Sequence, residues 1–129
     1  MKTLLTYLAG PIYGQSDESC FEWRKDATAV LRAKNIMTLD PTVRDYRGKE
    51  QENVDRIVIG DKRAIMAADT VLCYSPEPSY GTAMEVFFAW SMHKQVLTVT
   101  TSQSPWINYH STLVVPTLKE ALDLLEKKE

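Results

Sequence analysis

Asp61 is an acidic residue at a position where the surrounding pattern calls for an apolar one. Residues 51–67 carry apolar side chains at three- and four-residue spacing, which predicts an amphipathic helix. Asp61 falls on the apolar stripe, four residues after Ile57 and four before Ile65. An unpaired carboxylate facing a core costs free energy. Asp61 is therefore either half of a buried ion pair or a carboxyl group whose pKa is adjusted for proton transfer.

Glu85 is the second acidic residue in apolar surroundings. It interrupts the run Ala83–Trp90 and lies in the early turns of a helix predicted for residues 80–94. The helix dipole favours an ionised carboxyl there, and a desolvated carboxylate beside a sugar carbon is a capable nucleophile. Glutamate is also common at helix starts for capping reasons, but that explanation suits a wet face, and we expect this helix to have little.

The segment Ser79-Tyr80-Gly81-Thr82 joins a predicted strand to the start of the same helix. A helix N-terminus is a ready anion site, and Gly81 lets a ligand approach the backbone. Alone, such a turn is usually only a cap, but Glu85 follows about one turn later. Two carboxyl groups near one pocket suit glycosidic cleavage, in which one stabilises or traps the oxocarbenium-like sugar and the other protonates the leaving group.

Strands and helices must alternate along the chain to position these groups. Predicted strands are Thr3–Leu8, Ile36–Leu39, Thr70–Tyr74, Gln95–Thr100 and Leu113–Val115. Predicted helices are 18–34 with Asp17 as cap, 51–67, 80–94 and 117–128, with loops at 41–50 and 105–110. This order predicts one domain, residues 1–129, with an α/β fold: a doubly wound five-stranded parallel sheet in three α/β/α layers. Ligands of such sheets bind at the carboxyl ends of strands, here the loops 10–14, 40–48 and 75–81.

Composition narrows the classes of partner. The 129 residues carry a net charge of −2 with interspersed signs, so we expect no nucleic-acid polymer as partner. No apolar run approaches the ~20 residues of a membrane span. Cys20 and Cys73 lack metal-ligand spacing, and a buried free thiol is the usual state of Cys73, which favours a reducing, cytoplasmic protein without disulfides. His93 and His110 are far apart, and we expect no metal site.

Four segments together resemble the nucleoside 2-deoxyribosyltransferase family, which also contains nucleoside 5′-monophosphate N-hydrolases. They are Tyr7-Leu8-Ala9-Gly10-Pro11-Ile12, Gly60-Asp61-Lys62, Ala68-Asp69 and Ser79-Tyr80-Gly81-Thr82-Ala83-Met84-Glu85. The resemblance extends from the first strand to about Tyr109. It implies a flavodoxin-like sheet, in agreement with the alternating pattern, and a nucleoside or nucleotide as small-molecule substrate.

The resemblance also implies roles for individual residues. Glu85 would form a covalent glycosyl intermediate at C1′, Asp61 would donate a proton to the leaving base, and Tyr7 would position the nucleophile. The implied substrate-binding residues are Gly10, Ile12, Ser79, Gly81, Met84 and Asn108. Family sites are completed by a neighbouring subunit, which Asn108 would reach, so a homodimer or larger homo-oligomer is expected. No metal or organic cofactor is needed.

The substrate is the least determined of these expectations. Family transferases usually carry an aspartate at the position of Ser79, where the hydrolases have a serine that binds the 5′-phosphate; an aspartate would repel that phosphate. Asn108, in contrast, resembles the transferase version of the contact from the partner chain. The loop Arg44–Gly48 could hold a phosphate or be solvated. We favour a transferase that moves 2-deoxyribose between bases, over a nucleotide hydrolase and, in another class, a non-catalytic nucleotide-binding module.

Overall fold

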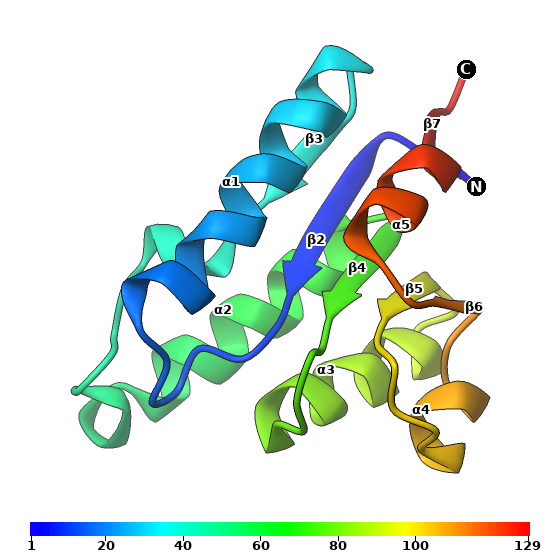
Figure 1. Ribbon diagram of the computed structural model, residues 1–129. Helices are drawn as coiled ribbons and strands as arrows, with labels where there is room; N and C mark the ends of the chain where they lie inside the picture. The colour runs from blue at the N-terminus through cyan, green and yellow to red at the C-terminus, as the bar shows by residue number, and fades with distance from the viewer.

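A five-stranded parallel sheet is the centre of the computed structural model, which describes residues 1–129. The strands are β2 (Leu5–Ala9), β3 (Met37–Leu39), β4 (Thr70–Tyr74), β5 (Gln95–Val99) and β6 (Leu113–Val115). They lie in the order β3-β2-β4-β5-β6, and every neighbouring pair is parallel (Figure 1). This is the flavodoxin-like order, and the predicted α/β fold is confirmed.

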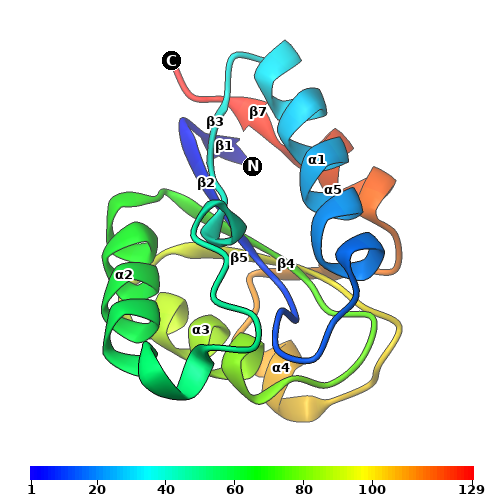
Figure 2. The same cartoon turned by 90° about the vertical axis from the view of Figure 1, so that its left-hand side faces the viewer.

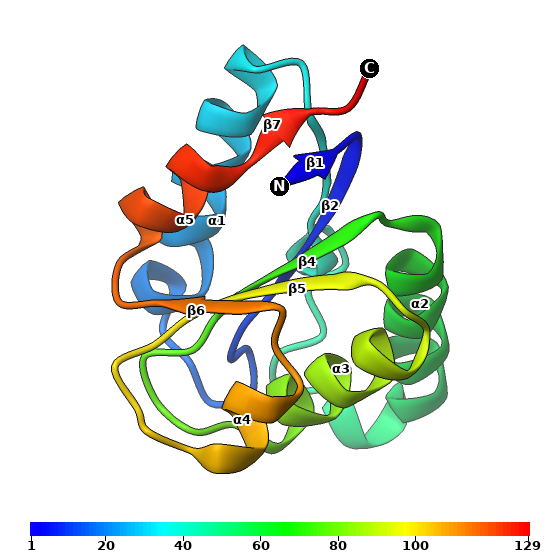
Figure 3. The ribbon, with the colours of Figure 1, turned by 90° about the vertical axis from the view of Figure 1, so that its right-hand side faces the viewer.

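Helices cover both faces of the sheet and form two separate cores. Helices α1 (Asp17–Ala33) and α5 (Leu118–Leu124) lie on one side, and α2 (Val54–Ala67) and α3 (Tyr80–Ser91) lie on the other (Figures 2 and 3). Successive strand residues alternate between the two cores: Leu8 packs with α1 and α5, whereas Tyr7 and Ala9 pack with α2 and α3. Tyr7 is therefore directed toward the helices that carry Asp61 and Glu85.

The first helix begins one residue earlier than predicted. Ser16 is extended and its side chain accepts a hydrogen bond from the Ser19 amide at 3.2 Å. Ser16 is thus the N-cap, and Asp17 lies in the first turn, where its negative charge suits the helix dipole. The helix ends at Ala33, close to the predicted end.

The two chain ends differ from the prediction because they pair with each other. The single strand predicted for residues 3–8 is divided into β1 (Lys2–Thr3) and β2. The closing helix stops at Leu124 instead of 128, since β7 (Glu126–Lys127) pairs in parallel with β1. The Glu126 amide donates to the Met1 carbonyl at 2.9 Å. Neither short strand has a sequence pattern of its own.

The structure also differs from the prediction at the end of α3, at the start of α2 and in the predicted 105–110 loop. Helix α3 ends at Ser91 rather than 94, because His93 adopts a left-handed φ of 60°. Short 3-10 turns η1 (Pro41–Val43) and η2 (Glu50–Glu52) occupy the predicted 41–50 loop and its end, so α2 starts at Val54 rather than 51. The predicted 105–110 loop contains α4 (Pro105–Tyr109), which is capped by Ser104. None of the helices combines the length and apolar character needed to span a bilayer.

Candidate active site

A cavity of about 650 Å³ lies at the carboxyl end of the sheet, where the chain reverses its direction of strand addition between β2 and β4. It is bordered by the loops after β2, β3 and β4 and by α2 and α3. Seven of the residues singled out in the sequence line it: Gly10, Ile12, Asp61, Ser79, Gly81, Met84 and Glu85. The three loops predicted to bind a ligand therefore meet at one cavity.

Tyr7 and Glu85 are joined by a hydrogen bond beneath this cavity. Tyr7 is buried on β2, and its hydroxyl donates to Glu85 Oε2 on the second turn of α3. Burial, followed by the neighbouring charge of Glu85, raises the pKa of Tyr7 far above its ordinary value. The tyrosine consequently stays protonated and acts as a fixed donor to the carboxylate.

Asp61 projects into the same cavity from α2 and is paired with Arg44. The Arg44 Nη2 lies 3.3 Å from Asp61 Oδ1, and the Asp61 side chain is 17% exposed. Burial raises the pKa of Asp61 to about 6, while the charge of Arg44 acts in the opposite direction. Asp61 is therefore an ion-pair partner whose pKa is also shifted toward neutrality; its part in proton transfer stays a prediction.

The two carboxyl groups influence each other. Burial, and then the negative charge of Asp61, raise the pKa of Glu85 to about 8, against the hydrogen bond from Tyr7 and the charge of Arg24. Like charges in one desolvated site cannot both form easily, so the pair retains a proton near neutral pH. That proton favours Glu85, since Arg44 stabilises the ionised form of Asp61.

Arg24 is a charged group near the site that the sequence analysis did not identify. It is fully buried in α1 and donates to the carbonyls of Cys20 at 2.6 Å and Gly10 at 3.0 Å. Its guanidinium also lies 4.7 Å from the ring centroid of Trp23. The signal was present in the sequence, because Arg24 lies on the apolar stripe of its helix, as Asp61 does. Arg24 fixes the start of the 10–14 loop.

Gly10 is held in that loop by close packing. A Cβ there would lie 2.8 Å from Trp23 Cζ2 and 2.9 Å from the Tyr74 carbonyl oxygen, so a larger residue would push the loop out of place. Gly81 is different, since no heavy atom lies within 4 Å of where its Cβ would be. Its backbone is open toward the cavity, as a ligand approaching the start of α3 requires.

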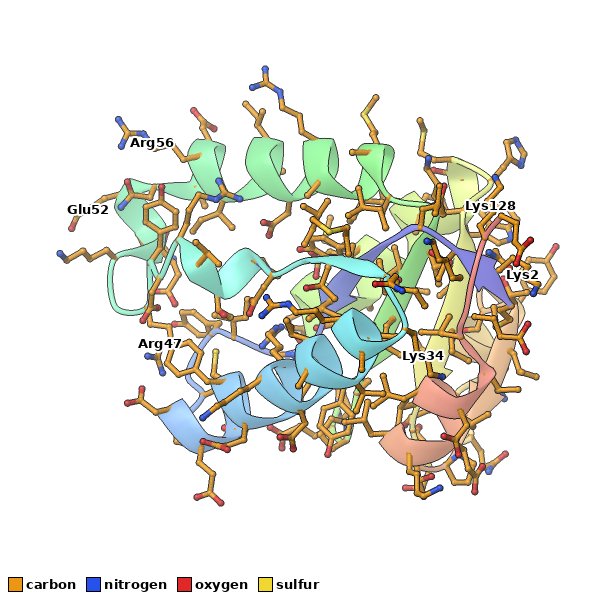
Figure 4. The ribbon with its side chains drawn as sticks, turned by 90° about the horizontal axis from the view of Figure 1, so that it is seen from above. Lys2, Lys34, Arg47, Glu52, Arg56 and Lys128 are labelled. Atoms are coloured by element: carbon orange, nitrogen blue, oxygen red, sulfur yellow. The ribbon has the colours of Figure 1, made fainter.

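The two arginines of the 44–48 loop have different environments. Arg47 makes ion pairs with Asp17 at 2.7 Å and with Asp45 at 2.9 Å, and stacks 4.6 Å from the centroid of Phe21. It therefore anchors the loop to α1 (Figure 4). Arg44 is directed instead at Asp61.

Asn108 does not line the cavity of its own chain. It is exposed on α4, although Trp106 of the same short helix borders the cavity. Helix α3 is also less enclosed than expected, because a row of its apolar side chains is exposed: Tyr80, Met84, Phe87 and Trp90. The expectation that this helix has little exposed surface was wrong for the isolated chain. No cluster of three or more His, Cys, Asp or Glu side chains is arranged to hold a metal ion.

Two solved structures share this architecture over most of the chain. The CMP N-glycosidase of Clostridium botulinum superimposes with a TM-score of 0.61 and 19% identity, over 92% of this chain and 96% of that one. A 2-deoxyribosyltransferase of Bacillus psychrosaccharolyticus superimposes with a TM-score of 0.70 and 16% identity, over 92% of this chain and 90% of that one. At such identities the likeness establishes the shared fold. No curated protein sequence matches the chain significantly.

The sequence itself matches a family model across most of its length. The matched segment, residues 6–124, contains the central sheet except for Leu5, the first residue of β2, and both carboxyl groups of the cavity. The family described by that model is nucleoside 2-deoxyribosyltransferase. The chain therefore belongs to the nucleoside 2-deoxyribosyltransferase family.

Proposed function

We propose that this protein cleaves the N-glycosidic bond of a nucleoside and transfers the 2-deoxyribose to a second base. The observation that carries the proposal is the pair of carboxyl groups, Asp61 and Glu85, which face one cavity from adjacent helices. Such a pair is what a retaining glycosidic reaction uses. Membership of the family and the fold shared with a 2-deoxyribosyltransferase support the same reaction.

The reaction has two displacements at C1′. The Glu85 carboxylate attacks C1′, a C1′–O bond forms and the C1′–N bond breaks, and the base leaves with a proton from Asp61. A second base then attacks C1′, releases Glu85 and returns a proton to Asp61. The Tyr7 hydroxyl, bound to Glu85 Oε2, fixes the direction of the nucleophile. No step requires a metal ion or an organic cofactor.

Substrate binding must move this proton from Glu85 to Asp61. Attack needs Glu85 ionised and Asp61 protonated, whereas the pair of Asp61 with Arg44 favours the reverse. Each carboxyl responds to the other, so a proton on Asp61 removes the negative charge that raises the pKa of Glu85. A base that separates Asp61 from Arg44 would therefore prepare both groups together.

Hydrolysis of a nucleoside 5′-monophosphate is the second candidate reaction. Ser79 caps α3, with its side chain accepting from the Thr82 amide at 3.4 Å, and it lines the cavity. A phosphate at this helix start would meet backbone N–H groups and no repelling carboxylate. The fold shared with a CMP N-glycosidase is compatible with this alternative. A non-catalytic binding module is less well supported, because it has no use for two desolvated carboxyl groups.

We also propose that the site is completed by a second copy of the chain. The cavity borders the exposed side chains of Met84, Phe87 and Trp106, which are 72%, 52% and 74% exposed. A cluster of large exposed apolar side chains marks an interaction surface. Asn108, on the same face but outside its own cavity, would then contact substrate in the partner's cavity.

The first prediction concerns the nucleophile. Purified protein given deoxynucleosides or their 5′-monophosphates, with and without a free acceptor base, should form a new nucleoside only with the acceptor, as chromatography would show. Glu85→Ala should lose this activity by at least ~10³-fold while keeping its circular-dichroism spectrum, because the covalent intermediate cannot form. Full activity of the variant would refute the mechanism. Base released from a monophosphate without an acceptor would favour the hydrolase.

The second prediction distinguishes the two substrates at Ser79. Ser79→Asp should keep the helix cap, since aspartate caps helices well. If the substrate is a monophosphate, like-charge repulsion should raise its KM by about tenfold or more. The matched nucleoside without phosphate is the control and should be affected much less. An unchanged KM for the nucleotide would remove Ser79 from the phosphate site.

The third prediction tests the shared site by subunit mixing. Glu85→Ala and Asn108→Ala protomers, co-expressed, should form mixed dimers in which one site has both Glu85 and Asn108 intact. Random pairing at equal amounts restores about a quarter of the sites. Each variant alone should remain impaired. If co-expression gives no more activity than the sum of the separate variants, one subunit holds the whole site.

The fourth prediction follows from the raised pKa of Glu85. The unfolded chain releases this proton near 4.5 and the folded protein near pH 8, so wild-type stability should fall as pH rises through this range. Glu85→Gln keeps a partner for Tyr7 but has no proton to lose. In urea titrations it should equal the wild type near pH 4 and exceed it by on the order of 4 kcal/mol near pH 8. Glu22→Gln, at an exposed site on α1, is the control. If the difference in unfolding free energy between variant and wild type does not change with pH for either variant, the assignment is contradicted.

A further inference from the structure

Arg44 lies in the cavity wall against the group to which we assign the proton of the departing base. Its Nη2 is 3.3 Å from Asp61 Oδ1, and its Nη1 donates to the Arg56 carbonyl at 3.3 Å. Both contacts are longer than the usual ~2.7–3.2 Å, and the side chain is 43% exposed. A guanidinium has five N–H donors. Arg44 is therefore partly exposed and has donors left for a ligand.

A glycine inside α2 makes room for this guanidinium. A Cβ at Gly60 would overlap the Arg44 guanidinium, which is the far end of a flexible side chain. Glycine in a helix interior is destabilising relative to alanine. The helix thus gives up stability at the point where Arg44 crosses it. The absence of a side chain at Gly60 leaves room for the guanidinium to lie against α2, beside Asp61.

The loop that carries Arg44 is fixed at both of its ends. Asp40 Oδ1 accepts from the Thr42 amide at 2.8 Å and closes the first 3-10 turn. Arg47 is held by Asp17 at 2.7 Å and lies beside the start of α1 (Figure 4). With the backbone held, Arg44 can exchange one partner for another by side-chain rotation alone.

We propose that Arg44 recognises the base. When a base binds, the guanidinium leaves Asp61 and donates to an acceptor atom of the base. This rests on the proposed function, which brings the leaving base against Asp61. Because a guanidinium only donates, it selects a base with an acceptor beside the atom that Asp61 protonates. A 6-oxopurine meets this demand, with N7 facing Asp61 and O6 facing Arg44. A 6-aminopurine would present an amino donor to the guanidinium.

The exchange of partners also serves the chemistry. Arg44 opposes the rise in the pKa of Asp61 that burial causes. When the guanidinium turns to O6, that opposition weakens and Asp61 gains the proton that it must give to N7 as the C1′–N9 bond breaks. Recognition of the base and protonation of Asp61 are then one event.

The test measures binding of two free bases, hypoxanthine and adenine, by titration calorimetry. Wild-type protein should bind hypoxanthine at least ~10-fold more tightly, since adenine leaves the guanidinium facing a donor. Arg44→Met should bring the two affinities within about threefold. Gly60→Ala is the sharper variant, because its Cβ displaces the guanidinium while Arg44 stays in the sequence. It should lose the same discrimination although its Tm rises by a few degrees.

Arg56→Met is the matched control. Its side chain extends from α2 into solvent (Figure 4), and only its backbone carbonyl meets Arg44. It should keep the wild-type preference. Equal affinities in the wild type, no binding of either base, or a preference that persists in both Arg44→Met and Gly60→Ala would overturn the proposal. The measurement uses free bases and breaks no bond, so its result can be interpreted even if the proposed transfer reaction fails. If the protein transfers the sugar but its preference between bases does not depend on Arg44, only the recognition role is overturned.

Discussion

The mutual repulsion of two carboxyl groups in one poorly solvated cavity is the constraint on which the rest of the site depends. Asp61 and Glu85 both have raised pKa values, because burial disfavours the charge of each, and the charge of Asp61 further raises the pKa of Glu85. The fold answers with donors of different kinds. Tyr7 offers a neutral hydroxyl to Glu85, and Arg44 offers a partly exposed cation to Asp61. In the proposed reaction, this difference between a buried and an exposed partner is what would allow the proton to move from one carboxyl group to the other.

Arg24 supplies the fixed positive charge behind this pair. A buried guanidinium is expensive unless its donors are satisfied, and here the carbonyls of Leu8, Gly10 and Cys20 accept from it. Asp40 lies 3.8 Å away at the end of β3. The charge of Arg24 lowers the pKa of Glu85, while the hydrogen bonds of Arg24 hold the loop that borders the cavity. One residue thus links the position of the loop to the ionisation of the proposed nucleophile.

The sequence was informative wherever function breaks an apolar pattern. Asp61 and Glu85 stood out because their neighbours are apolar, and the alternation of strands and helices sufficed to predict the parallel sheet. Arg24 breaks the same kind of pattern, but arginine is so common on amphipathic helices that its burial went unnoticed. The pairing of β1 with β7 depends on backbone partners more than a hundred residues apart, which no local pattern records. The role of Gly60 could not be predicted from the sequence, because no local pattern shows that the Arg44 side chain lies against α2 at this residue.

Helix α3 connects the chemistry to the proposed assembly. One side of it, with Val86 and Ala89, packs on the sheet, and the opposite side exposes Phe87 and Trp90. A helix that is apolar on all sides is expected to be buried on all sides, and one chain buries only half of this one. If a second copy covers the other half, the proposed nucleophile lies on the helix that joins the two subunits. Glu85 would then be fully shielded from water only in the assembled protein. The reactivity of the proposed nucleophile and the association of the chains would therefore depend on the same helix.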